Sequence, residues 1–199
     1  TASQLLDVNT KRLIPMCFHS EKYLEICRKE FQKLIDLGAD GILYDECQHH
    51  GPAALCFDTT HNHRYGESVY AKDNELVQMF RDMLPDDKKD SFLFAGEDIY
   101  DWEYEQYQLS YHRSENKYHI PVRKYLAGNS KVMTAVTGFH DRRMINQCLM
   151  YQYVISYEPY NFKGSLYDFP KTLQYGQKMD ALRTQLSEYL WNGNFMGYY

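Results

Sequence analysis

The sequence predicts an α/β protein with a parallel sheet, and three observations lead to this expectation. Short apolar runs end in acidic residues at 41–46 and 92–98. Uninterrupted apolar runs are typical of strands that are covered on both faces, as in parallel sheets. Amphipathic helical segments alternate with these runs, which is the pattern of βα units. We favour the C-terminal half of a (β/α)8 TIM barrel, with a complete small doubly wound sheet as the alternative.

The first half of the chain is expected to contain two helices and two strands. Apolar side chains recur at helical spacing over residues 20–37, where Ser20 is a candidate N-cap and Gly38 a candidate end of the helix. The elements expected after it are a strand at 41–45, a polar loop at 46–67, a helix at about 68–84 and a strand at 91–96.

The second half of the chain continues the alternation of helices and strands. The elements expected there are a tyrosine-rich helix at 103–113, a strand at 131–137, a helix at 141–152, a strand at 153–157 and a helix at about 171–191. Every predicted strand is followed by polar or acidic residues. This favours a barrel, because a doubly wound sheet concentrates such residues at one switch point.

Length and composition limit the classes of function. The 199 residues suffice for one domain with a substantial core, but a complete barrel typically takes about 250 residues. The chain begins with Thr1, and we expect the whole of it to be one barrel segment of a larger protein. The net charge of −5, without a basic stripe, argues against nucleic acid as a partner. No run is apolar enough to predict a membrane span. Five cysteines without regular spacing do not predict a disulfide scaffold.

The acids at the two strand ends are the candidate catalytic residues. Side chains alternate along a strand, so only one acid of each pair should face the barrel mouth; we choose Asp45 and Glu97. Neighbouring parallel strands lie about 4.8 Å apart, which would let two carboxylates approach the separation of about 5 Å found in retaining glycosidases. Asp45 would be the nucleophile and Glu97 the general acid/base. The alternative is that such acids cap a helix or pair with arginine.

The polar loop at 46–67 is rich in histidine. We expect its polar side chains to contact substrate; they are His49, His50, Asp58, His61, His63 and Arg64. His61 and His63 would also suit a transition metal, but their spacing matches none of the well-known zinc patterns. We therefore assign no metal and no cofactor to the predicted function, and keep a metal-dependent hydrolase that uses the loop as an alternative.

Further substrate contacts are expected at the other strand ends, where aromatic rings could stack on a sugar. They are Tyr44, Asp101, Trp102, Arg142, Tyr157, Glu158 and Tyr160. Among them, Glu158 is the principal rival of Glu97 for the acid/base role.

Several of these motifs resemble one enzyme family. Residues 39–45 (ADGILYD) look like the nucleophile strand of glycoside hydrolase barrels in the α-galactosidase and endo-α-N-acetylgalactosaminidase group. Segments 56–63 (CFDTTHNH), 95–97 (AGE) and 156–164 (SYEPYNFKG) look like a bacterial branch of that group. The resemblance covers most of residues 12–195. The endo-acting members use an Asp after the fourth strand and a Glu after the fifth, and the resemblance places these roles on Asp45 and Glu97.

The resemblance implies a retaining glycoside hydrolase that acts on an α-linked galactose-type sugar. The α-galactosidases proper place their acid/base on the sixth strand, where this chain offers only Asp141. Members of the group carry flanking β-domains and a complete barrel, so the expected partners are a carbohydrate substrate and a remaining barrel half, from the parent protein or another chain. A non-catalytic carbohydrate-binding barrel is the third possibility.

Overall fold

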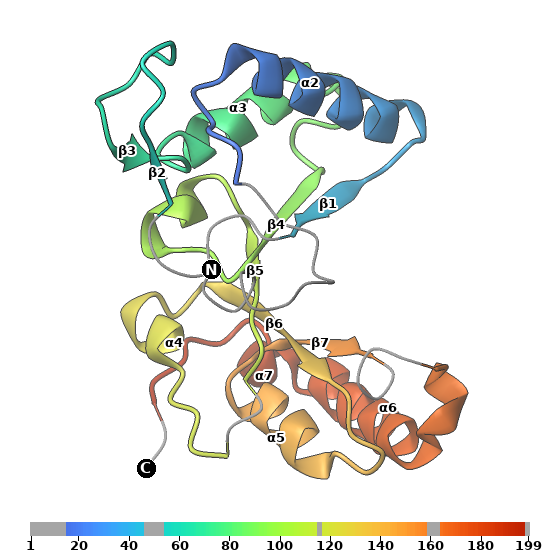
Figure 1. Ribbon diagram of the computed structural model, residues 1–199. Coiled ribbons are helices and arrows are strands. Elements are labelled where there is room, and N and C mark those ends of the chain that lie inside the picture. The colour runs from blue at the N-terminus through green and yellow to red at the C-terminus, as the bar shows by residue number, and fades with distance from the viewer. Residues whose placement is uncertain (1–14, 46–53, 115–116, 159–163, 198–199) are drawn as a thin grey trace. The chain divides into compact units, whose positions relative to one another are not determined.

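The structure is a computed structural model that describes residues 15–45, 54–114, 117–158 and 164–197 (Figure 1). The chain divides into two compact units. The first unit comprises Thr1–Asp40 and His50–Ser91, and the second comprises Gly41–His49 and Phe92–Tyr199. No helix among the described residues is long and apolar enough to cross a membrane.

The first unit combines two helices with a small hairpin. Helix α2 spans Glu21–Asp36 and helix α3 spans Asp73–Met83. The helices pack through Phe31 and Phe80, whose stacked rings have centroids 4.5 Å apart. Strands β2 (Leu55–Cys56) and β3 (Glu67–Ser68) pair in antiparallel fashion within the segment predicted as a loop.

Helix α2 confirms the sequence prediction closely. Its N-cap is Ser20, although the serine side chain makes no capping hydrogen bond. The helix ends because Gly38 adopts a φ of +80°, and the Gly38 N–H donates to the carbonyl of Ile35. Glycine takes this left-handed conformation without steric cost, which is why it commonly ends helices.

The second unit contains a five-stranded parallel sheet, which confirms the α/β class. Its strand order is β1 (Gly41–Tyr44), β4 (Leu93–Glu97), β5 (Leu109–Tyr111), β6 (Lys131–Val136) and β7 (Val154–Tyr157). The strands of this sheet are therefore neighbours in the order in which the chain makes them. The helical segments of the unit are η1 (Asp101–Glu105), α4 (Val122–Leu126), α5 (Arg142–Met150), η3 (Leu166–Asp168), α6 (Pro170–Gln185) and α7 (Ser187–Leu190).

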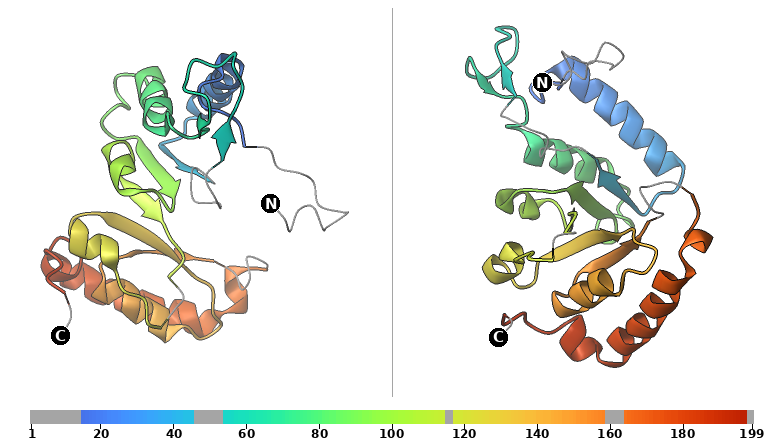
Figure 2. Two further views of the ribbon diagram at one scale, coloured as in Figure 1. Left: turned by 60° about the vertical axis from the view of Figure 1, so that its left-hand side comes forward. Right: turned by 60° about the horizontal axis from the view of Figure 1, so that its bottom comes forward.

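Helices α5 and α6 lie on one face of this sheet at β6 and β7 (Figure 2). Val132 and Val136 of β6 form the core there with Met144, Ile145 and Cys148 of α5. The opposite face of the sheet carries two large apolar side chains that stay accessible. Leu43 is 47% exposed and Leu93 is 44% exposed.

The predicted helix at 103–113 is wrong. A short 3-10 helix ends at Glu105, and strand β5 follows at 109–111. The helix was predicted because tyrosines recur at helical spacing at 104, 107 and 111. Leu109, Ser110 and Tyr111 are instead all buried, as expected for a central parallel strand. The sheet consequently has five strands in the second unit, where the sequence predicted four in all.

Other differences concern the ends of helices. Helix α3 begins at Asp73 instead of about 68, because residues 67–68 pair with β2. The predicted helix at 171–191 breaks at Leu186 into α6 and α7. The short helix α4 is an element that the sequence patterns did not indicate.

Candidate functional site

The two acids predicted to be catalytic lie at the ends of neighbouring strands. Strands β1 and β4 pair in parallel, with Leu43 opposite Ala95 and Tyr44 opposite Gly96. The pairing ends there; Asp45 is the next residue after β1, in a turn, and Glu97 is the last residue of β4. Paired residues of parallel strands face the same side of a sheet and lie about 4.8 Å apart. Glu97 is only 6% exposed, whereas Asp45 is exposed.

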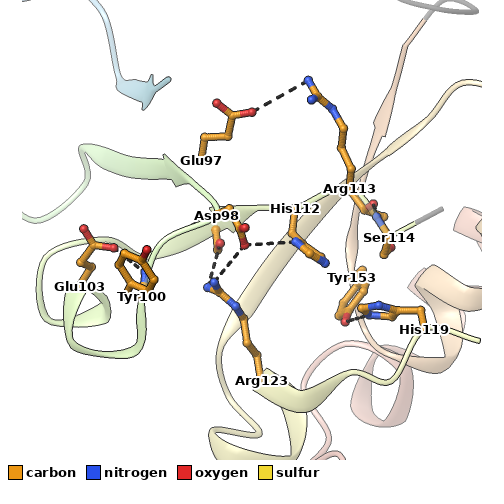
Figure 3. Close-up of polar contacts among 12 residues, drawn as sticks. Glu97, Asp98, Tyr100, Glu103, His112, Arg113, Ser114, His119, Arg123 and Tyr153 are labelled. Carbon is orange, nitrogen blue, oxygen red and sulfur yellow. Dashed lines mark hydrogen bonds and ion pairs between the residues drawn. The ribbon is translucent and has the colours of Figure 1, made fainter. Parts of the chain in front are cut away.

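An arginine faces the buried acid. Arg113 follows β5, and its guanidinium lies 4.0 Å from Oε1 of Glu97 (Figure 3). The same guanidinium lies over the ring of Tyr111, 5.6 Å from its centroid. The arginine side chain is half exposed, while the glutamate side chain is 7% exposed. Arg113 therefore places a positive charge on the side of the sheet to which Glu97 points.

A second acid, Glu158, joins this group from the position directly after β7. The hydroxyl of Tyr111 donates to Oε1 of Glu158 at 2.9 Å, and the hydroxyl of Ser156 donates to the same oxygen at 2.8 Å. Burial, followed by the hydrogen bond to Glu158, raises the pKa of Tyr111 to about 12. We call Glu97, Tyr111, Arg113 and Glu158 the strand-end cluster.

The other members of the strand-end cluster keep Arg113 positively charged. Burial lowers the pKa of the guanidinium, but contact with Tyr111 and the charges of Glu97 and Glu158 raise it by more. The net pKa lies above the ordinary value for arginine. The cluster therefore combines two carboxyl groups, a phenol that keeps its proton and a permanent cation.

Asp98 belongs to a different set of contacts. Its backbone has a positive φ of 49°, and its Oδ1 lies 3.2 Å from Nδ1 of His112 and 3.1 Å from the guanidinium of Arg123. Figure 3 shows these partners on the other side of the strand from Glu97. Arg123 also donates to the hydroxyls of Tyr104 and Ser110. Within this pair of acids, Glu97 is thus the residue that faces Arg113.

Aromatic rings follow β4 directly. Tyr100 and Trp102 stack with centroids 5.0 Å apart and an interplanar angle of 17°. Trp102 is 61% exposed, and Asp101, which separates the two residues in the sequence, is exposed as well. Solvent-exposed stacked rings of this kind present a flat apolar face to a ligand.

The other predicted substrate contacts have different surroundings. Tyr157 packs against the helix side of the sheet, where its hydroxyl approaches Gly176 of α6. Arg142 at the start of α5 lies over the ring of Tyr175, 5.0 Å from its centroid. Tyr44 is half-buried at the end of β1. His49, His50 and Tyr160 lie outside the described residues.

The histidines of the first unit gather around two cysteines. The ligand atoms of Cys17, Cys56, His61 and His63 all lie within 4.8 Å of one another, so these residues could hold a metal ion. We call them the Cys/His cluster. The backbone N–H of Asp58, followed by the side chains of His61, His63 and Cys17, lowers the pKa of Cys56 to about 7 against the effect of burial. The predicted contact Arg64 is exposed beside the cluster.

Sequence reasoning missed residues in both clusters. Tyr111 and Arg113 were hidden by the wrong helix at 103–113, although a buried tripeptide followed by polar residues repeats the pattern of the other strand ends. Cys17 was missed because 38 residues separate it from Cys56, and only the fold brings the two together.

Comparisons with models of protein families, with curated proteins and with solved structures found no match. Proposals about function therefore depend on the residues of the two clusters and on the sequence motifs.

Proposed function

We propose that this chain is part of a retaining glycoside hydrolase that acts on an α-linked galactose-type sugar. Asp45 is the nucleophile and Glu97 the general acid/base. The observation that supports the proposal is the parallel pairing of β1 with β4, because Asp45 directly follows β1 and Glu97 ends β4. Strand spacing of about 4.8 Å is compatible with the separation of about 5 Å that retention requires.

The proposed architecture is a (β/α)8 barrel. The described strands β1, β4, β5, β6 and β7 follow one another in the sheet in chain order, as strands do around a barrel, whereas a doubly wound sheet reverses its order at a switch point. The face that carries exposed Leu43 and Leu93 would line the barrel interior. Closure needs further strands, which the remaining half of the parent protein or another chain would supply.

The substrate is proposed from the side chains around the acids. The stacked rings of Tyr100 and Trp102 offer a platform for the apolar face of a pyranose. Arg113 and Glu158 offer a charged donor and an acceptor for sugar hydroxyls. The preference for an α-linked galactose-type sugar comes from the sequence resemblance alone.

The proposed mechanism has two steps. Glu97 donates a proton to the glycosidic oxygen while Asp45 attacks the anomeric carbon, so the leaving group departs as an alcohol and a glycosyl ester forms on Asp45. Glu97, now a carboxylate, removes a proton from water, which attacks the anomeric carbon and releases the sugar with its configuration retained. When Glu97 carries its proton, Arg113 must exchange its contact with Glu97 for a contact with the substrate. The side chain of Arg113 is half exposed, so it can turn away from Glu97.

The test is turnover of a panel of aryl α- and β-glycosides by the full-length protein that carries this sequence. Asp45→Ala should abolish turnover, and added azide should restore it with a glycosyl azide of inverted configuration as product. Glu97→Gln should lower kcat by about 10²- to 10⁴-fold, with a smaller loss for substrates that have good leaving groups. Glu105→Gln is the matched control, because Glu105 is an exposed acid shortly after β4.

Two outcomes contradict the proposal. Full activity in Asp45→Ala and Glu97→Gln would show that other residues perform the chemistry. Sugar binding without any turnover in the wild-type protein would favour a carbohydrate-binding barrel.

A further inference from the structure

The Cys/His cluster unites two segments that are distant in the sequence. Cys17 precedes α2, whereas Cys56 lies in β2 and the two histidines lie in the turn between β2 and β3. Both cysteines are almost buried, at 5% and 9% exposure. All four residues belong to the first unit, so the cluster is complete within one compact part of the chain.

Backbone hydrogen bonds hold the two segments together. The N–H of Phe18, next to Cys17, donates to the carbonyl of Val69 at 2.8 Å. The N–H of Val69 donates in turn to the carbonyl of Ala54 at 2.9 Å. The N–H of Gly66 donates to the carbonyl of Cys56 at 2.9 Å, which closes the hairpin turn. Backbone hydrogen bonds thus bring the two segments together without using the four candidate ligand side chains.

A hydrogen bond of the His63 ring determines which of its two nitrogens could bind a metal ion. Nδ1 lies 2.7 Å from the carbonyl of Arg64, and a carbonyl can only accept, so Nδ1 carries the proton. In the neutral ring, Nε2 therefore holds a lone pair. This Nε2 is buried and makes no hydrogen bond within the described part of the chain beyond its contact with the Cys56 thiol, a member of the same cluster. A buried ring nitrogen with a free lone pair is what a metal ligand requires.

His61 has the surroundings of a metal-binding histidine too. Its Nδ1 lies 3.3 Å from Sγ of Cys56, inside the cluster. Its Nε2 lies 3.7 Å from Oδ2 of Asp58, outside the cluster. A carboxylate behind the second ring nitrogen orients many metal-binding histidines and strengthens their ligation. Asp58 is itself held by the backbone N–H and the hydroxyl of Thr60.

The chemistry of the four donors selects the metal. Two thiolates and two imidazoles form a common tetrahedral set for Zn²⁺, whereas Mg²⁺ and Ca²⁺ prefer oxygen ligands. With zinc–ligand bonds of about 2.0–2.3 Å, tetrahedral ligand atoms lie roughly 3.3–3.8 Å apart. The 3.3 Å contact between Cys56 and His61 already has this scale. The separations, none above 4.8 Å, need to contract by about 1.5 Å at most.

We propose that Cys17, Cys56, His61 and His63 bind one Zn²⁺ ion in a structural site. Four protein ligands complete the tetrahedral shell, so no position remains for a water or a substrate. The ion would tie the segment before α2 to the β2–β3 hairpin. The proposal is independent of the glycosidase proposal, since it needs no activity and uses none of the strand-end cluster.

The test starts with wild-type protein purified without chelator. Elemental analysis should give one zinc ion per chain. After exchange, Co²⁺ should produce the intense visible bands of tetrahedral cobalt together with a thiolate-to-cobalt charge-transfer band. Cys17 and Cys56 should resist a thiol reagent until a chelator is added. These readouts need no variant, so a variant that fails to fold does not weaken the test.

Matched variants then assign the ligands. Cys17→Ser and His63→Gln should lose zinc on dialysis, whereas Cys27→Ser and His19→Gln should keep one ion per chain. Cys27 is a free cysteine on α2, and the ring of His19 lies 4.8 Å from that of His63 without belonging to the cluster. Asp58→Asn should weaken zinc binding about 10- to 100-fold.

Three results would overturn the proposal. The first is wild-type protein without zinc whose thiols react equally with and without chelator. The second is a disulfide between Cys17 and Cys56. The third is bound Co²⁺ with only the weak bands of six-coordinate cobalt.

Discussion

The hydroxyl of Tyr111 donates to Oε1 of Glu158 at 2.9 Å and thereby connects the end of β5 with the residue that follows β7. Strand β6 lies between these two strands in the sheet. Ser156 donates to the same carboxylate oxygen at 2.8 Å. The two hydroxyl groups fix the orientation of Glu158, and the longer reach of tyrosine is what allows a link across an intervening strand.

Removing the tyrosine hydroxyl should therefore destabilise the protein. Tyr111→Phe keeps the buried ring but leaves Glu158 with Ser156 as its remaining hydroxyl donor. A hydrogen bond to a charged group typically contributes about 2 kcal/mol, so we expect the free energy of unfolding in urea to fall by about that amount. Tyr167→Phe is the control, because Tyr167 is 91% exposed. Equal stability of the two variants would mean that the hydrogen bond contributes nothing.

The two candidate acids of the strand-end cluster should differ in their effect on catalysis, if the glycosidase proposal holds. Glu158→Gln keeps an acceptor for both hydroxyl donors, so we expect turnover of aryl glycosides to stay within about tenfold of wild type. Glu97→Gln should cost about 10²- to 10⁴-fold in kcat. Both are measured on one substrate with a poor leaving group. The reverse order of losses would transfer the acid/base role to Glu158.

The contact between Arg113 and Glu97 is expected to be weak in energy. The two charges lie 4.0 Å apart, but the arginine side chain is 50% exposed and therefore screened by solvent. A double-mutant cycle with Arg113→Met and Glu97→Gln should give a coupling energy of about 0.5–1 kcal/mol in urea unfolding. The coupling should decrease when salt is added.

A coupling energy of about 3 kcal/mol, independent of salt, would contradict this expectation. It would indicate that Arg113 compensates a buried charge. Arg143→Met serves as a control because Arg143 is an exposed arginine on α5.

The sequence alone was sufficient to predict strands and helices that have a strong local pattern of apolar residues. Strands β1 and β4 were predictable because continuous apolar runs end in acids, and α2 because its periodicity is bounded by Ser20 and Gly38. The adjacency of β1 and β4, assumed from their similar endings, is confirmed by their parallel pairing. These patterns were reliable because each one reflects which side chains of a single strand or helix are buried.

Contacts that depend on the fold could not be predicted. Strand β5 has only three residues, too few to establish a period, and neighbouring tyrosines suggested a helix. The Cys/His cluster depends on the pairing of the segment around Phe18 with Val69, and no local spacing encodes this pairing. The sequence indicated that His61 and His63 would suit a transition metal but favoured substrate contact for them, and Cys17 became a candidate only through the fold.

Cys148 should make the stability of the protein depend on alkaline pH. Its side chain is fully buried among Met144, Ile145 and Val132, and burial raises its pKa from 9.0 to about 12. The unfolded chain loses this proton above about pH 9, while the folded protein keeps it. The unfolded state then binds fewer protons, so the free energy of unfolding falls as pH rises from about 9 towards 12. Below about pH 9 the contribution is fully present.

The comparison that isolates this effect is between wild type and Cys148→Ala, both unfolded reversibly in urea under reducing conditions. From about pH 8 to about pH 10, wild type should lose about 1.4 kcal/mol more than the variant. The alanine variant should be less stable at every pH because it leaves a cavity, so only the change with pH is diagnostic. Cys148→Ser, which does not titrate either, should show the same reduced pH dependence as Cys148→Ala. Equal pH dependence in wild type and both variants would show that the thiol of Cys148 ionises without cost in the folded protein, which a fully buried site does not allow.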